Sequence, residues 1–264
     1  MFPLKDNIPT RRFPVLTVAL IAINVVMFFV FQQAELSFGG ADVDQENVIE
    51  YGAIPYEITH PGEQCVPSGP ESLACGESAA VEREAGRSLA PTILTVFTSM
   101  FMHGGLLHII GNMLFLWIFG NNIEDSMGRV KFLVFYLLGG IAALLAQTAI
   151  GPDSAIPTIG ASGAVAAVLG AYALLYPRAR VVTLVFIIFF VTVLELPALL
   201  VLGLWFLLQL FYGSAELTQP VAGGGGGVAY FAHIGGFVFG LVLIKLFADR
   251  ERDDYEVDRG LPVY

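Results

Sequence analysis

Charged side chains are scarce in this sequence. Only 14% of the 264 residues are Asp, Glu, Lys or Arg, whereas 56% are hydrophobic, and soluble domains usually carry about 25% charged residues. A soluble protein this apolar would have too few polar side chains to cover its surface, so the composition predicts a multi-pass integral membrane protein. Positive charge is the scarcer sign, and the net charge of −10 argues against a nucleic-acid partner.

Cysteine is nearly absent too. The two copies, Cys65 and Cys75, lie in one polar stretch, and neither is near a histidine at the spacing of a metal site. They form either a small loop disulfide, if that stretch faces an oxidising compartment, or two free thiols. The sequence also lacks the His-Glu-x-x-His pattern of zinc proteases. We therefore expect neither a metal nor a cofactor.

Long apolar runs are what the sequence has in abundance. Six of them can cross about 30 Å of hydrocarbon as helices. They are 13–32, 100–120, 130–150, 161–177, 197–213 and 228–247. We expect an all-α polytopic protein, a six-helix transmembrane bundle with a long first outer loop at 33–92. A cytoplasmic N-terminal segment (1–12) would precede this membrane domain (13–247), and a cytoplasmic tail (248–264) would follow it.

The positions of Lys and Arg set the expected orientation. With six spans and the N-terminus inside, eleven of the 13 lie on the cytoplasmic side and only Arg83 and Arg87 lie outside, a strong positive-inside bias. The apolar segment 181–194 is short for a span, which leaves a hairpin, a re-entrant piece or a tilted helix open. Counting it as a seventh span would reduce the bias to seven against six. We therefore expect six spans, with both termini on the cytoplasmic side of a prokaryotic plasma membrane.

A few polar side chains interrupt these spans, where polar groups are costly and usually face the bundle interior. His108 and Asn112 are four residues apart and share one face of the second span. Ser162 opens the fourth span, and His233 lies near the start of the sixth. All three spans run from outside to inside, so these four residues meet at one depth near the outer face. His103 is predicted to make a structural contact, which either anchors a loop or lies at the helix start.

Small residues at helical spacing predict which helices touch. One stripe lies on the fourth span and a matching one lies on the sixth, below His233. The stripes consist of Gly163, Ala167 and Gly170, and of Gly236 and Gly240. Such faces let membrane helices approach closely, so we expect the His233 imidazole within hydrogen-bond reach of the Ser162 hydroxyl.

These residue types suit acyl transfer. A serine hydroxyl is a weak nucleophile that needs an adjacent base, so we predict Ser162 as the nucleophile and His233 as its base. A tetrahedral intermediate needs donors aimed at its oxyanion. Asn112, His108 and the Ser162 amide at a helix N-terminus can supply them. The spans contain no carboxylate suited to orient His233, so the unit is predicted to be a dyad.

In combination, three segments resemble the rhomboid family of intramembrane serine proteases. They are the His-x₄-His-x₃-Asn run ending at Asn112, the Gly-x-Ser-Gly run at 160–163 and the Ala-His-x₂-Gly-x₃-Gly run at 232–240, all within residues 90–247. The resemblance implies a Ser162–His233 dyad, an oxyanion site of His108, Asn112 and the Ser162 amide, and a water-filled cavity open to the outer side. It also implies single-span membrane proteins as substrates, cut in or near the transmembrane segment, often at small residues.

The chain departs from some family members in two respects. Its first outer loop has no Trp-Arg pair, and Ala166 stands where those members place a Tyr that stacks on the histidine. We therefore expect His233 to be held by packing, against an aromatic such as Tyr172 or Tyr230. Five consecutive glycines at 223–227 predict a mobile lid over the site, with a plain flexible connector as the alternative.

Two other functions compete with proteolysis. Polar residues within spans can line a transport path, but the sequence shows no inverted repeat and no carboxylate suited to ion coupling. A non-catalytic relative that binds membrane helices would fit better if Ser162 or His233 were replaced. The expected partners are transmembrane-helix protein substrates and the lipid bilayer, and the sequence does not set the oligomeric state.

Overall fold

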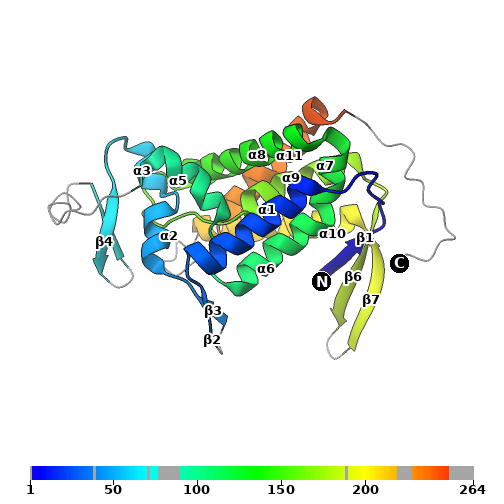
Figure 1. Cartoon of the computed structure of the whole chain (residues 1–264), viewed down its shortest axis with the longest axis horizontal. Coiled ribbons are helices and arrows are strands. Elements are labelled where there is room, and N and C mark those ends of the chain that lie inside the picture. The colour runs from blue at the N-terminus through cyan, green and yellow to red at the C-terminus, as the bar shows by residue number, and fades with distance from the viewer. Residues whose placement is uncertain are drawn as a thin grey trace.

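The computed structural model describes residues 2–37, 40–69, 72–76, 90–187, 190–218 and 228–249. Helices dominate this part of the chain. Figure 1 shows the long helices side by side in the middle of the molecule, with small β-hairpins at both ends. The glycine run predicted as a lid and all but two residues of the predicted C-terminal tail lie outside the described residues.

All six apolar segments predicted as spans contain helix. Four helical stretches among the described residues are long and apolar enough to cross a membrane, namely Leu106–Met127, Arg129–Ile150, Ala198–Leu217 and Tyr230–Phe247. Shorter apolar helical stretches cover Val15–Phe31, Thr92–Phe101 and Ser162–Leu175. The mostly helical membrane architecture is thus confirmed, and the count of six spans stays a prediction.

The helical elements of the described residues follow this order along the chain. They are α1 (Val15–Val26), η1 (Met27–Phe31), α2 (Gln45–Tyr51), α3 (Pro55–Thr59), α5 (Thr92–Thr98), η2 (Ser99–Phe101), α6 (Leu106–Phe115), η3 (Leu116–Gly120), α7 (Asn121–Met127), α8 (Arg129–Ile150), α9 (Ser162–Leu175), α10 (Ala198–Thr218) and α11 (Tyr230–Phe247). The second predicted span begins later than expected, because η2 and two glycines precede α6. Gly128, at a φ of 78° that favours glycine, turns the chain from α7 into α8.

A three-stranded sheet corrects the all-α expectation. The strands β6 (Arg180–Ile187) and β7 (Phe190–Pro197) form an antiparallel hairpin, and β6 also pairs with the N-terminal strand β1 (Phe2–Asp6). Segment 181–194 is therefore a hairpin, one of the three forms left open. Its many β-branched and aromatic residues favour this extended form.

The insert between the first two predicted spans is built from short elements. They are β2 (Glu35–Ser37), β3 (Gly40–Asp42), α2, α3, β4 (Cys65–Gly69) and β5 (Ser72–Cys75). Cys65 and Cys75 face each other across β4 and β5 and form a disulfide, so the free-thiol alternative is wrong. The insert contacts the connection between α8 and α9, through a β-bridge of Ala53 with Thr158.

At the end of the bundle opposite the insert, segments that are distant in sequence contact each other. Glu124 in α7 accepts hydrogen bonds from the backbone N–H groups of Leu16 and Thr17, at 3.0 and 2.8 Å, and so caps the first turn of α1. β1 and the β6–β7 hairpin form their sheet at this same end (Figure 1). The N-terminus, the end of α7 and the hairpin therefore lie together, as one side of a membrane requires.

The backbones of α9 and α11 pack directly against each other. A Cβ on Gly236 would overlap the carbonyl oxygen of Gly163, and a Cβ on Gly240 would overlap that of Ala167. Gly170 meets the α11 backbone in the same way. The predicted contact between the two small-residue stripes is confirmed, and it holds only while these positions lack a side chain.

We predict that Gly240→Ala lowers the stability of the protein by about 1–3 kcal/mol, because its methyl group must force two backbones apart. Gly203 in α10 is the matched control, since a Cβ there has nothing within 4 Å. Thermal unfolding in detergent should show a lower midpoint for Gly240→Ala and an unchanged or higher one for Gly203→Ala. Equal midpoints for the two variants would contradict the close contact.

Asp6 is buried at the end of the bundle that carries the N-terminus. Its carboxylate accepts hydrogen bonds from the hydroxyl of Tyr172 at 2.6 Å and from Nδ2 of Asn122 at 2.7 Å. Burial raises the pKa of Asp6 from 3.8 to about 7. The predicted cytoplasmic segment 1–12 is thus partly packed into the bundle.

The free energy of unfolding should fall as the pH rises through the range in which Asp6 titrates. The folded pKa of Asp6 lies above its unfolded value, so its contribution is fully present below pH about 4 and is lost as the pH approaches about 7. The loss amounts to no more than about 4 kcal/mol. Asp6→Asn should therefore shrink the difference in thermal midpoint between pH about 5 and about 8, whereas the exposed Asp153→Asn should not. If Asp6→Asn kept the wild-type difference in thermal midpoint between the two pH values, Asp6 would not be the group that causes this difference.

Candidate active site

Ser162 is the first residue of α9 and lies beside a glycine with an unusual backbone. Gly160 has a φ of 123°, a conformation that L side chains rarely adopt. A Cβ on Gly160 would lie 2.8 Å from Nε2 of His108 and 3.4 Å from Oγ of Ser162. The serine hydroxyl and the histidine nitrogen therefore flank one point, which is open because residue 160 is glycine.

His108 presents an N–H group to this point. Its Nδ1 accepts a hydrogen bond from the Gly104 N–H at 3.4 Å, so the neutral ring carries its proton on Nε2. His103 packs its ring against that of His108, with centroids 5.1 Å apart. Gln32 donates to the His103 carbonyl at 2.9 Å and accepts from its N–H at 2.8 Å. These hydrogen bonds use the His103 backbone, and both ring nitrogens are buried without a hydrogen-bond partner among the described residues, so the predicted structural role of the side chain stays a prediction.

Asn112 lies one turn after His108 on α6 and is 8% exposed. Its side-chain nitrogen Nδ2 is buried and has no hydrogen-bond partner among the described residues. Buried donors are normally paired, and an unpaired one costs about 1–3 kcal/mol. An amide left unpaired in the resting protein is suited to a partner that arrives only during a reaction.

His233 is oriented by a side chain from α10. Its Nδ1 lies 2.8 Å from Oε1 of Gln209, and Nε2 of Gln209 donates to the Trp205 carbonyl at 3.2 Å. That second bond sets the direction of the amide, so Nδ1–H of His233 donates and Nε2 keeps a free lone pair. The Trp205 ring also faces the imidazole, with centroids 5.7 Å apart.

The side chains that hold His233 are not the predicted ones. Tyr172 lies at the opposite end of the bundle, bonded to Asp6, so its predicted role is wrong. Tyr230 stacks on another tyrosine, and the imidazole contacts come from α10. Gln209 is a polar residue within a predicted span, so the signal that singled out the other site residues could have found it too.

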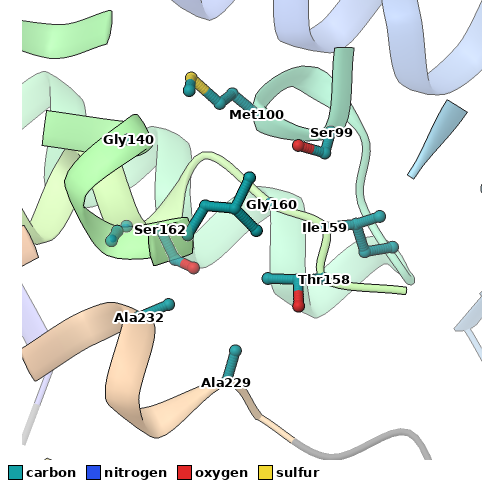
Figure 2. Close-up of a pocket in the computed structure, with 12 residues that line it drawn as sticks. Ser99, Met100, Gly140, Thr158, Ile159, Gly160, Ser162, Ala229 and Ala232 are labelled. Atoms are coloured by element: carbon teal, nitrogen blue, oxygen red, sulfur yellow. The ribbon is translucent and has the colours of Figure 1, made fainter. Parts of the chain in front are cut away.

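The packing of α9 on α11 brings Ser162 and His233 to one region. The residue after Ser162 is Gly163, and a Cβ there would lie 3.9 Å from the carbonyl oxygen of Ala232, the residue before His233. Figure 2 shows Ser162 between Ala232 on α11 and the η2 turn that carries Ser99. Of the predicted residues, Ser162 lines the small pocket and His108 lies near it across Gly160, while the reach of His233 to the Ser162 hydroxyl stays a prediction.

The pocket beside Ser162 is lined mostly by small or apolar side chains. Gly140, Ala143, Ala229 and Ala232 contribute to its wall, together with Met100. Figure 2 shows Met100 and Ala229 on opposite sides of it. Because the glycine and alanine residues in this wall have small side chains, they leave room for a small group next to the serine hydroxyl.

Comparison with known proteins agrees with this membrane architecture. A model of the Rhomboid domain matches residues 90–250, which is more than half of the chain. The protein is therefore an integral membrane protein, and the chain belongs to the rhomboid family.

Named relatives cover the same region. Rhomboid protease GluP of Bacillus subtilis (strain 168) is 28% identical over 158 residues, which are 60% of this chain and 24% of that protein. Rhomboid protein 1, mitochondrial, of Saccharomyces cerevisiae is 30% identical over 159 residues, 56% of this chain and 40% of that protein. RHOMBOID-like protein 12, mitochondrial, of Arabidopsis thaliana is 31% identical over 158 residues, 52% of this chain and 45% of that protein. The match spans less than half the length of each of these relatives.

Proposed function

We propose that the protein is an intramembrane serine endopeptidase that cuts single-span membrane proteins in or near their transmembrane segment. Ser162 is the nucleophile, His233 its base, and His108 and Asn112 stabilise the oxyanion. The observation that carries the proposal is the convergence of Ser162 Oγ and His108 Nε2 on one open point beside Gly160. Membership of a family with named proteases supports it.

The proposed reaction is acyl transfer through Ser162. Nε2 of His233 takes the proton of the hydroxyl as Oγ bonds to the carbonyl carbon of the substrate. The charge that develops on the carbonyl oxygen is met by Nε2–H of His108 and by the unpaired amide of Asn112. The C–N bond then breaks, and His233 gives its proton to the leaving amine. Water attacks the acyl-serine by the same steps and regenerates Ser162.

The length of α9 supports a reaction below the membrane surface. α9 has 14 residues and α8 has 22, so α9 is about 12 Å shorter at 1.5 Å per residue. Its last residues lie at the end that carries the β1–β6–β7 sheet, since Tyr172 bonds Asp6 of β1. The length by which α9 is shorter than α8 is therefore missing at the end of α9 that begins with Ser162. A substrate helix must unwind before its peptide bonds are accessible there, and glycine or proline in the substrate would ease this step.

We further propose six spans with both termini on the cytoplasmic side of a prokaryotic plasma membrane. The disulfide of the insert supports an oxidising outer side at that end of the bundle. Basic residues at the other end support a cytoplasmic side there, with Lys5, Arg178 and Arg180 close to the β1–β6–β7 sheet.

The pocket of glycine and alanine beside Ser162 supports a substrate with a small side chain near the scissile bond.

Cleavage of a model transmembrane substrate in liposomes tests the proposed function. Wild type should cut it, and Ser162→Ala and His233→Ala should abolish cutting. Asn112→Ala should reduce kcat by about 10²-fold, the usual cost of removing one oxyanion donor. Ser214→Ala and His60→Ala are matched controls, because both residues lie outside the site and both hydrogen bond to nearby backbone. Cutting by Ser162→Ala at the wild-type rate would overturn the proposal.

Gln209 is proposed to position His233 without touching the substrate. Gln209→Leu should lower kcat by about tenfold, which corresponds to about one hydrogen bond, with KM unchanged. Gln209→Glu keeps an acceptor for Nδ1–H and should retain more of the wild-type kcat than Gln209→Leu. Leu208→Ala, at a half-exposed position on the same helix, is the control and should behave as wild type. A wild-type kcat in Gln209→Leu would exclude the positioning role.

A further inference from the structure

The β6–β7 hairpin (Arg180–Pro197) extends from one end of the bundle with apolar side chains exposed. Phe186 is 61% exposed, Phe190 76% and Val191 60%. Figure 1 shows the hairpin and β1 projecting sideways from the helices, across the direction in which the long helices run. The half of the hairpin near the bundle is covered, since Val181 and Thr183 are buried where β1 pairs with β6.

The exposed half of the hairpin is apolar on both faces. Residues opposite each other in an antiparallel pair share a face, and successive residues alternate. Phe186 pairs with Val191 on one face, while Phe190 lies on the other and is exposed as well. Leu194 shares the face of Phe190 and is 41% exposed, although it pairs with the buried Thr183 at the border of the covered half. A hairpin in water normally keeps one face polar. From residue 181 to residue 194 this one has no charged side chain on either face.

Both ends of the hairpin connect directly to apolar helices of the bundle. α9 ends at Leu175, five residues before β6, and α10 begins at Ala198, directly after β7. The first turn of α10 exposes Leu199 and Leu200. The apolar surface of the hairpin is thus continuous with the helix surface that faces lipid, and both leave the bundle at one membrane surface.

Charge marks the base of the hairpin. Arg178 and Arg180 are exposed at its start, and Glu195 is exposed near its end. Basic side chains beside an apolar segment attract anionic lipid headgroups. The backbone limits how deeply the hairpin can enter the membrane, because β7 pairs only with β6 among the described strands and its other edge is open. An open strand edge does not occur within hydrocarbon, whereas headgroups and water can pair with it.

We propose that the β6–β7 hairpin is a membrane-interface anchor. It lies flat in the boundary between headgroups and acyl chains on the side of the N-terminus, with lipid against both faces and Arg180 on anionic headgroups. This goes beyond the proposed protease function and does not depend on it. Lipid is favoured over a protein partner because both faces are apolar, whereas a docking surface needs only one apolar face.

Spin labels on single introduced cysteines in the full chain test this in liposomes, since Cys65 and Cys75 are already paired. Val191→Cys and Leu194→Cys report the two faces of the hairpin. Asp153→Cys, exposed in the connection between α8 and α9, is the aqueous control. Val242→Cys, 64% exposed on α11, is the control within the hydrocarbon.

Oxygen should relax both hairpin labels more effectively than a water-soluble nickel complex does. The ratio of the two accessibilities should be several-fold above that at Asp153 and below that at Val242. Nickel accessibility equal to that at Asp153 on either face would overturn the proposal. So would loss of access to both reagents on one face, which would indicate a second copy or another protein there.

The lipid headgroups are tested separately by removing charge. In vesicles of phosphatidylcholine and phosphatidylglycerol, Arg180→Gln should lower the oxygen-to-nickel ratio at Val191. In vesicles of phosphatidylcholine alone, the same substitution should leave that ratio unchanged. An equal effect of Arg180→Gln in both kinds of vesicle would contradict the contact with anionic headgroups.

Discussion

The contact between the backbones of α9 and α11 determines the geometry of the site. Gly236 and Gly240 rest on carbonyl oxygens of α9, so the distance between the helices is set by backbone atoms alone. His233 lies one turn before Gly236, and Ser162 begins the helix that Gly236 touches. A hydrogen bond tolerates only a few tenths of an ångström. Any side chain at this contact would therefore shift His233 relative to Ser162.

The remaining parts of the site come from helices that cross near this contact. α6 brings an N–H of His108 and the unpaired amide of Asn112, and α10 brings the amide that orients His233. A neutral amide can fix the tautomer of an imidazole without placing a carboxylate within the membrane, where an ionised group is expensive. The lack of a suitable Asp or Glu in the spans is thus consistent with an oriented histidine.

Local periodicity explains which features the sequence could predict. The glycine stripes of α9 and α11, and the shared face of His108 and Asn112, follow from helical spacing alone. The hairpin of residues 181–194 could not be decided, because a short apolar run suits a strand or a helix and its partner β1 is far away in sequence. The bond between Gln209 and His233 depends on how α10 is rotated against α11, which no local pattern encodes. The burial of Asp6 depends likewise on contacts with α7 and α9.

Covalent labelling of the nucleophile tests the central claim, that His233 activates Ser162, most directly. The purified protein would be treated with a fluorophosphonate in detergent, and its peptides would be analysed by mass spectrometry. A single adduct on Ser162, formed by wild type and lost in His233→Ala, is the expected result. An adduct on another serine instead, or labelling of Ser162 at an equal rate in His233→Ala, would contradict the proposed dyad.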